Sequence, residues 1–194
     1  MALTVGAFLG LLALVAVLRG VELMISRRHQ RILSSRGAQK ADDPDFCWMA
    51  GLHAGVLVGA AIEVVILKRP LVALLAVPAA VLFAAANVVR WWVIATLGEH
   101  WNVRVIDSVG MGVIDAGPYR WVRHPNYAAV FLELAALPMI HTAWLTASVG
   151  SALHVWVLAR RLAVEERVLQ VDPDYRARMG HKPRFLPRLN RGRA

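Results

Sequence analysis

The segment Gly117–Tyr127, with the sequence GPYRWVRHPNY, contains the residue types of this chain that could do chemistry. It holds Arg120, Arg123, His124 and two tyrosines, and strongly apolar stretches flank it. Arginine, histidine and tyrosine side chains donate hydrogen bonds to anionic groups. In so apolar a chain, this cluster is expected to bind a charged ligand at a membrane edge rather than only to connect two helices.

Pro125 gives this segment a fixed direction. Its ring sets its own φ and disfavours a helical conformation at His124, which aims the side chains of Arg123 and His124 just before a helix begins. A proline in the first helical turn also leaves nearby backbone N–H groups free to bind a cofactor carboxylate or phosphate. The alternative is a basic helix end with an interfacial tyrosine, which fits Arg120 or Arg123 alone better than the whole of Arg123–Tyr127.

Two adjacent carboxylates, Glu165 and Glu166, come just past the last predicted helix. Neighbouring residues do not share a helix face, so their partners should differ. One can pair with an arginine while the other accepts hydrogen bonds from a ligand, such as those of ribose hydroxyls. The alternative is ordinary surface pairing with Arg161 or Arg167.

The C-terminal tail contains Asp174-Tyr175-Arg176 and then the run Lys182–Pro187. Two prolines bracket Arg184 and Phe185, which predicts an ordered extended segment. Arg184 could hold a carboxylate through two parallel hydrogen bonds. Anchoring to lipid headgroups is the alternative, and it is favoured for Arg188, Arg191 and Arg193.

The segment Leu97–Val105 leaves the third predicted helix and contains Trp101, which either walls a pocket or belongs to an interfacial aromatic belt. Ionisable residues within membrane helices are functional candidates by default, and four such residues of the predicted helices are singled out. Of these, Glu133 is the strongest candidate because it follows Tyr127 by six residues and lies near the cytoplasmic side. Glu63 is expected to be structural. His154 is either functional or a core histidine whose hydrogen bonds are satisfied within the protein. The fourth residue is His53.

The composition indicates an integral membrane protein. Of the 194 residues, 58% are hydrophobic and only 18% are charged, too few to cover every apolar segment. The net charge of +9 fits cytoplasmic loops and anionic lipid headgroups, not nucleic acid. The single cysteine, Cys47, excludes an internal disulfide and a multi-cysteine metal site, and we expect it in the apolar core. No metal site is expected.

We predict an all-α fold with about five membrane helices in a single domain, 1–194. Three N-terminal helices occupy 1–97, and a catalytic region with a helical hairpin and a C-terminal tail occupies 98–194. The first helix is expected to be retained, not cleaved as a signal peptide. The fourth helix is short for a full span of about 20 residues and is expected to form a tight hairpin with the fifth near His141. The predicted bounds are 3–25, 46–67, 71–97, 127–140 and 143–163.

The distribution of Lys and Arg predicts the orientation. A basic loop after the first helix, the 98–127 region and the residues from 160 onward all fall on one side, and only Lys68 and Arg69 lie on the other. The positive-inside rule then places the N-terminus outside and the C-terminus in the cytoplasm. The Gly117–Tyr127 segment and the tail therefore share the cytoplasmic face, where they form a cofactor-binding region.

The residues resemble the isoprenylcysteine carboxyl methyltransferase family over roughly 85–190. The matching pieces stand in the family's order: Gly117-Pro-Tyr119, Arg123-His-Pro-Asn-Tyr127, Glu165-Glu166, Tyr175 and Arg184-Phe-Leu-Pro187. The N-terminal half is similar to that of bacterial members, through Glu22, Arg36-Gly-Ala38 and His53. Ala129 stands where many members have glycine.

The resemblance implies a membrane enzyme that uses S-adenosylmethionine and methylates an oxygen of a lipophilic acceptor. It implies Arg184 beside the methyl-transfer site, and Arg184 or Arg123 would orient a carboxylate acceptor. A phenolic or enolic acceptor would need a base, for which Glu133 and Glu166 are the candidates. The implied cofactor contacts are Tyr119, His124, Pro125, Tyr127, Glu165 and Glu166, to which we add Gly117 and Trp101.

Two alternatives remain open at this point. Membrane sterol and steroid reductases, which use NADPH, carry a string similar to Arg123–Tyr127, although the tail Lys182–Pro187 is similar to that of the methyltransferases. A non-catalytic scaffold whose basic face binds anionic lipid is the second. Membrane lipid and a lipophilic small molecule are the expected partners, with no nucleic acid.

Overall fold

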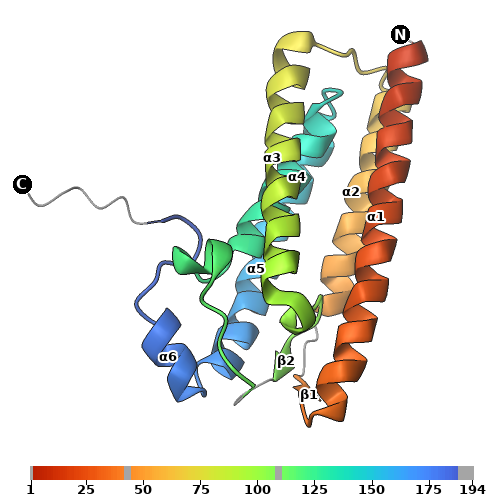
Figure 1. Cartoon of the computed structure of the whole chain (residues 1–194). Helices are drawn as coiled ribbons and strands as arrows, with labels where there is room; N and C mark the ends of the chain where they lie inside the picture. Colours follow the sequence, from red (N-terminus) through yellow and green to blue (C-terminus); the bar gives the residue numbers. More distant parts are fainter. Residues whose placement is uncertain (1, 42–44, 108–110, 188–194) are drawn as a thin grey trace, which may run out of the picture.

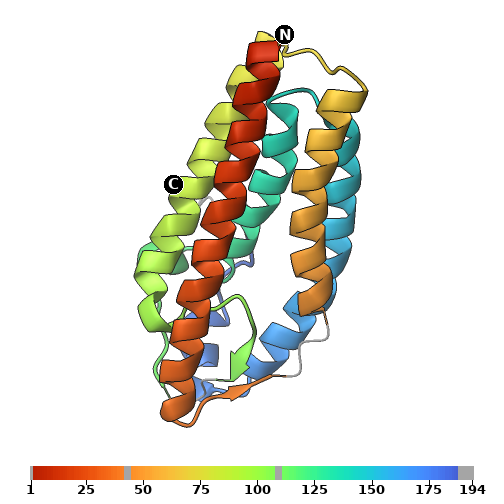
Figure 2. The same ribbon diagram turned by 90° about the vertical axis from the view of Figure 1, so that its right-hand side faces the viewer.

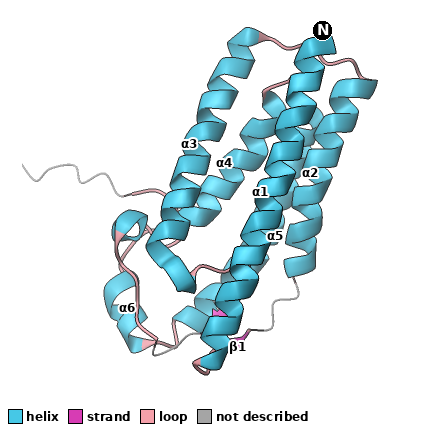
Figure 3. Cartoon of the chain, turned by 45° about the vertical axis from the view of Figure 1, so that its right-hand side comes forward, coloured by secondary structure: helices cyan, strands magenta, loops and turns pink. Residues whose placement is uncertain are grey.

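The computed structural model describes residues 2–41, 45–107 and 111–187. Arg188, Arg191 and Arg193, predicted as lipid anchors, lie outside these residues. Within them the chain is almost entirely helical (Figures 1 and 3). The long helices are α1 (Ala2–Ser35), α2 (Phe46–Ile66), α3 (Ala73–Leu97), α4 (Pro125–Met139) and α5 (Trp144–Leu169). A short helix α6 (Pro173–Met179) and two 3₁₀ turns, η1 (Gly98–His100) and η2 (Gly117–Arg120), complete the set.

The long helices run in alternating directions and form one bundle (Figures 1 and 2). Helix α3 packs against α4, α4 against α5, α5 against α2, and α2 against α1. The N-terminus of α1, the α2–α3 connection and the α4–α5 turn lie at one end (Figure 1). The polar connections and α6 lie at the other end. The structure therefore gathers the Gly117–Tyr127 segment and the tail at one end of the bundle, as the sequence predicts.

Three helices of the described chain are long and apolar enough to cross a membrane: α1, α2 and Ala73–His100, which is α3 with η1. The α4 helix has only 15 residues, and the last third of α5 is charged. Helix α4 contains Pro138 and ends one residue later, and the hairpin turn that follows places Thr142 at φ 53. The predicted hairpin is thus confirmed, while the count of five spans stays a prediction.

Two helices are longer than predicted. Helix α1 continues ten residues past Ile25, so Arg27, Arg28 and Arg31 lie on a helix and not in a loop. The extension is held by tertiary contacts, because the hydroxyl of Ser26 accepts a hydrogen bond from the N–H of Val103 at 3.0 Å. Helix α5 likewise runs to Leu169, which places Glu165 and Glu166 inside the helix, not just past it.

A two-residue strand pair was not predicted. β1 (Gln39–Lys40) pairs antiparallel with β2 (Ile106–Asp107), and it ties the connection after α1 to the loop after η1. The prediction that Cys47 lies in the apolar core was wrong, because Cys47 is exposed on α2. Its position on an outward face leaves it without the packing that a core cysteine has.

Candidate active site

A cavity of about 540 Å³ opens at the polar end of the bundle and reaches inward between the helices. Its size falls in the usual range for a small-molecule site, roughly 300 to 1,000 Å³. The polar part is lined by Trp101, Tyr119, Arg123, His124, Asn126, Tyr127, Glu165 and Tyr175. The apolar part is lined by Leu23, Met49, Ala50, Ala54, Leu57 and Val130, with charged and histidine side chains at its inner end. One cavity thus joins a polar chamber to an apolar one.

The tail closes against the start of α4. The backbone N–H of Arg123 donates to the carbonyl of Pro183 at 2.9 Å, and that of His124 donates to the carbonyl of Arg184 at 2.8 Å. His124 has φ −129 and is not helical, so α4 begins at Pro125, two residues before the predicted bound, with the proline in the first turn as expected. The N–H groups before Pro125 are not free for an anion, because the tail's carbonyls occupy them. The ordered tail is confirmed, with Asp174-Tyr175-Arg176 in helix α6.

Glu166 joins the tail to the start of α4 through its ion pairs and hydrogen bonds. Its carboxylate accepts two hydrogen bonds from Arg184, at 3.0 and 2.5 Å, and lies 3.2 Å from both Arg123 and His124. Burial alone would raise the pKa of Glu166, but the hydrogen bond from Arg184 and the charge of Arg123 lower it below its ordinary value. Pairing with Arg161 or Arg167, the alternative expectation, is not what the structure shows for this residue.

Glu165 points to a different set of partners, as expected for adjacent helical residues. Its carboxylate accepts a hydrogen bond from the hydroxyl of Tyr127, and its Oε1 lies 3.7 Å from His124 Nδ1. Arg161 donates to the same Tyr127 hydroxyl at 3.2 Å and to the carbonyl of Val103. Tyr127, His124 and Glu165 therefore hold one another in place on the cavity wall.

Four buried polar atoms in the polar part of the cavity wall have no hydrogen-bond partner among the described residues. They are the Trp101 Nε1, the Arg123 Nε, the Asn126 Oδ1 and the Tyr175 hydroxyl. A buried polar atom without a partner is costly, which points to a ligand that supplies one. Burial and the charge of Glu165 raise the pKa of Tyr175 to about 12, so its hydroxyl is a hydrogen-bond donor.

Trp101 walls the cavity, as one of the two sequence interpretations predicted. Its side chain is 2% exposed, and it packs with Val93 and Ile94 of α3. Tyr119 lies on the same wall, where burial raises the pKa of its hydroxyl.

Five of the predicted site residues do not line this cavity: Gly117, Pro125, Glu133, Glu166 and Arg184. Gly117 packs against α3, where a Cβ would lie 2.4 Å from the Thr96 hydroxyl. Pro125 acts through the backbone, and Glu166 and Arg184 lie behind His124 and Arg123.

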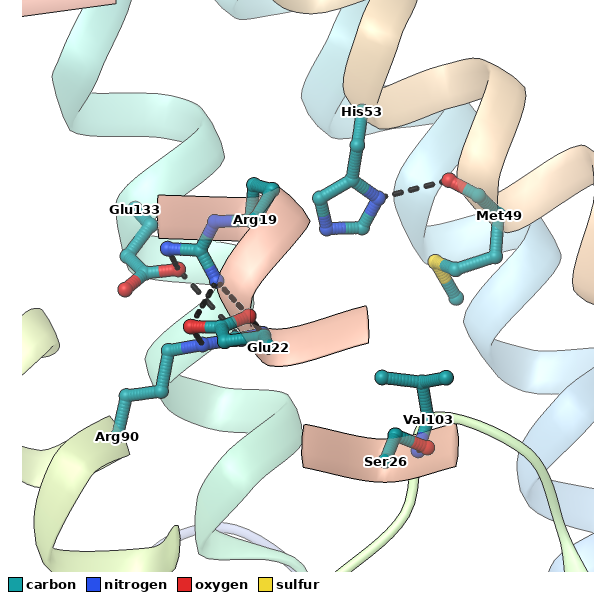
Figure 4. Close-up of polar contacts among 8 residues, drawn as sticks. All are labelled: Arg19, Glu22, Ser26, Met49, His53, Arg90, Val103 and Glu133. Carbon is teal, nitrogen blue, oxygen red and sulfur yellow. Dashed lines mark hydrogen bonds and ion pairs between the residues drawn. The ribbon is translucent and has the colours of Figure 1, made fainter. Parts of the chain in front are cut away.

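Glu133 also lies outside the polar chamber, in a buried cluster of two arginines and two glutamates that sequence reasoning missed (Figure 4). Arg90 of α3 donates to Glu22 of α1 at 2.8 and 2.5 Å, and Arg19 donates to Glu22 at 2.8 Å. Arg19 also donates to Glu133 of α4 at 3.1 Å, and Arg90 lies 3.6 Å from it. The cluster ties α1 to α3 and α4. The signal in the sequence was Arg19 and Glu22, one turn apart in an apolar helix.

Two histidines line the cavity beside this cluster. The Nδ1 of His53 lies 2.7 Å from the carbonyl of Met49, one turn earlier on α2. The ring of His154 lies edge-on to it, with centroids 6.2 Å apart. His154 is not a satisfied core histidine, because neither ring nitrogen has a hydrogen-bond partner in the described part of the chain. Glu63 is structural as expected, since it accepts from two N–H groups at the start of α5 and pairs with Arg69.

The described residues contain no group of three or more His, Cys, Asp or Glu side chains placed to hold a metal ion. The polar chamber instead offers aromatic rings, hydroxyls and carboxylates, which suit an organic cofactor with ribose hydroxyls and an amino group.

Comparison with known proteins gives a family and two relatives. The model of the isoprenylcysteine carboxyl methyltransferase family matches residues 79–171, which run from α3 to the end of α5. An uncharacterized protein of Bacillus subtilis, YpbQ, is 28% identical over 161 residues, covering 82% of this chain and 95% of that protein. An uncharacterized protein of Haemophilus influenzae is 27% identical over 158 residues, which cover 81% of this chain and 91% of the Haemophilus protein.

The family match spans the elements that build the cavity's polar end, including Trp101, Tyr119, the Arg123–Tyr127 segment and both glutamates of α5. Members of this family are membrane methyltransferases that use S-adenosylmethionine. The part of the chain that carries the site, residues 79–171, is therefore similar to the isoprenylcysteine carboxyl methyltransferase family.

Proposed function

We propose that this protein transfers a methyl group from S-adenosylmethionine to an oxygen of a lipophilic molecule at the membrane. The observation that carries the proposal is the single cavity that joins a polar chamber, built on Tyr119, Tyr127 and Glu165, to an apolar chamber between the helices. Such a shape holds a polar cofactor and an alkyl or isoprenoid chain end to end. The acceptor is a carboxylate or a phenolic or enolic hydroxyl.

The polar chamber fits the cofactor. Glu165 offers a carboxylate for ribose hydroxyls or for the amino group, and the unpartnered Trp101 N–H, Asn126 amide and Tyr175 hydroxyl offer further hydrogen bonds. Arg104 lines the same cavity and stacks its guanidinium over the Phe46 ring at 4.0 Å, so its charge suits the cofactor's carboxylate. Gly117 contributes indirectly, because its close approach to α3 places Tyr119.

S-adenosylmethionine supplies an activated methyl group on a sulfonium. The chain's own residues position the reactants and exclude water, which are the two contributions such a displacement needs. Tyr127 and His124 form the wall behind the cofactor, and Glu166 with Arg123 and Arg184 locks that wall to the tail. Arg123 lines the cavity and would help to orient the reactants, whereas Arg184 would act only through its ion pair with Glu166.

The proposed setting is a multi-pass inner or cell membrane, with the N-terminus outside and the C-terminus in the cytoplasm. The basic residues at the end of the bundle that carries the polar chamber support this orientation, by the positive-inside rule. The cofactor then enters from the cytoplasm, and the lipophilic acceptor enters from the bilayer.

Calorimetric titration of the detergent-purified protein with S-adenosylmethionine, and separately with NADPH, tests the class of enzyme. The wild type should bind S-adenosylmethionine, and His124→Ala should lose most of that affinity because it disconnects both glutamates from the wall. His141→Ala is the matched control, since His141 is also fully buried but belongs to the α4–α5 turn, which lies at the opposite end of the bundle (Figure 1). Binding of NADPH alone would move the chain to the reductases.

A further inference from the structure

The inner end of the apolar chamber indicates which kind of oxygen is methylated, an inference that rests on the proposed function. From the contacts around His53 we propose that the acceptor is an uncharged acidic hydroxyl, phenolic or enolic, whose proton passes to His53 Nε2 during methyl transfer. The acceptor is then not a carboxylate. Three features of the structure lead to this assignment.

The hydrogen bond of His53 fixes which ring nitrogen carries a proton. The Met49 carbonyl can only accept, so His53 Nδ1 must donate to it at 2.7 Å. In a neutral imidazole the other nitrogen, Nε2, then has a free lone pair. No hydrogen bond joins Nε2 to any residue in the described ranges, and His53 lines the cavity. His53 therefore presents an acceptor for a proton, held in one orientation by its own helix.

The second feature is the charge balance of the inner end. Arg19 and Arg90 are the cations there, and both are paired with Glu22 and Glu133 at 3.6 Å or less. The two positive charges meet two negative charges, so the cluster offers no surplus cation to a carboxylate acceptor. An ionised acceptor entering an apolar chamber without a counter-charge would lose its hydration without compensation, which is strongly unfavourable.

The other cations of the cavity do not change this balance. Arg123 is paired with Glu166, and Arg161 donates to Tyr127 and to the carbonyl of Val103. Arg104 stacks over Phe46 at the first turn of α2, and His53 lies seven residues further, about 10 Å along the helix axis. The charge of Arg104 therefore belongs to the polar chamber.

The third feature is His154, which extends the histidine site. It is fully buried on α5, lines the cavity, and has no hydrogen-bond partner for either nitrogen in the described part of the chain. Its ring lies edge-on to that of His53, and the centroid of the Phe131 ring lies 6.2 Å from its own. A buried imidazole without a partner is satisfied when a ligand hydroxyl enters beside it. Both histidines therefore fit a neutral, hydrogen-bonding head group.

The two glutamates considered as bases in the sequence are held by arginines in this structure. Glu166 is bound by Arg184, Arg123 and His124, and Glu133 by Arg19 and Arg90. Neither carboxylate lines the cavity, so neither reaches an acceptor that is held there. His53 lines the cavity with a free lone pair on Nε2, so it is the proton acceptor that the geometry offers there.

The step balances with the atoms named. The hydroxyl oxygen forms a new bond to the methyl carbon while the methyl–sulfur bond of the donor breaks, and that electron pair stays on sulfur. The O–H bond breaks, its proton goes to His53 Nε2, and the ring later returns it to water.

The test compares two amphiphiles with the same chain, 4-dodecylphenol and dodecanoic acid, as acceptors of a radiolabelled methyl group. The wild type should methylate the phenol in preference to the acid. His53→Gln should lose roughly 100-fold to 10,000-fold in phenol methylation, the usual contribution of a general base. Its affinity for S-adenosylmethionine should stay within about twofold, since Glu165 and Tyr127 are untouched. His141→Gln, a buried histidine outside the cavity, should match the wild type.

Preferential methylation of the acid would overturn the proposal, and so would a His53→Gln variant that methylates the phenol as fast as the wild type. Equilibrium binding to the cofactor-free protein gives a second measurement. The phenol should bind more tightly than the acid, and His53→Phe should weaken phenol binding by about 2-fold to 12-fold through one lost hydrogen bond. Equal or tighter binding of the acid contradicts the assignment. Failure to bind S-adenosylmethionine contradicts the proposed function instead and leaves this binding comparison intact.

Discussion

Arg184 and Glu166 form a two-point ion pair that fastens the C-terminal tail to α5. The guanidinium donates through Nε and Nη2 to the two carboxylate oxygens at 3.0 and 2.5 Å. The same carboxylate lies 3.2 Å from Arg123, and the Arg184 carbonyl accepts from the His124 N–H. One side chain therefore couples the tail, the start of α4 and the end of α5.

Glu166→Gln should change the response of stability to acid. The pKa of Glu166 in the folded protein lies below its ordinary value of 4.5, so its stabilising contribution is complete above that value and is lost as the pH falls through the lower folded pKa. The thermal midpoint in detergent, measured from pH 7 to pH 3, should therefore fall more steeply for the wild type than for Glu166→Gln. Glu99→Gln, which removes an exposed partner of Arg36, should keep the wild-type slope. Parallel curves for wild type and Glu166→Gln would contradict the expectation.

Glu22→Ala should be among the most destabilising single changes in the bundle. It leaves Arg19 and Arg90 buried without their shared carboxylate, and breaking a buried pair from one side costs about 3–5 kcal/mol. The measurement is the free energy of unfolding in mixed detergent, with Arg36→Ala as the control because its pair with Glu99 is exposed. The control should lose less than about 1 kcal/mol. If both variants lose the same amount, the cluster does not hold α1 to α3 and α4.

Gly117→Ala should displace the segment that carries Tyr119. The residue has φ 53, and a Cβ would lie 2.4 Å from the Thr96 hydroxyl, so both the backbone and the contact with α3 must adjust. We expect a loss of about 1–3 kcal/mol in stability and weaker binding of S-adenosylmethionine. Gly6→Ala is the matched control, because nothing lies within 4 Å of its Cβ position in helix α1. It should be neutral or stabilising by up to about 1 kcal/mol.

Trp101→Phe should weaken binding of the cofactor without lowering the stability of the fold. The change keeps an aromatic ring on the cavity wall but removes the buried Nε1–H, which has no partner among the described residues. If that N–H binds the cofactor, affinity measured by calorimetry should fall about 2-fold to 12-fold, the value of one hydrogen bond. Trp156→Phe, on an exposed face of α5, should leave affinity unchanged. Unchanged affinity in Trp101→Phe would place the cofactor elsewhere in the cavity.

The all-helical membrane architecture could be predicted because long uncharged runs allow few other structures. Helix ends were harder, since α1 and α5 extend past their apolar stretches on contacts such as Ser26 with Val103, which no local pattern records. Cys47 was misplaced for a related reason, as a bilayer allows apolar residues to face outward as well as inward.

Some features of the candidate site could likewise be predicted from the sequence, and others depend on the tertiary structure. The types and order of Tyr119, His124, Tyr127 and the two glutamates carry the family resemblance and predict the class of chemistry, because a motif is a local property of the chain. Tertiary structure decided how charges are paired: it brought Glu22 from α1 to Arg90 of α3, and it set Arg184 on Glu166. It also turned His53 and His154 into the same cavity. Charge balance depends on distances between helices far apart in sequence, so only the folded bundle determines it.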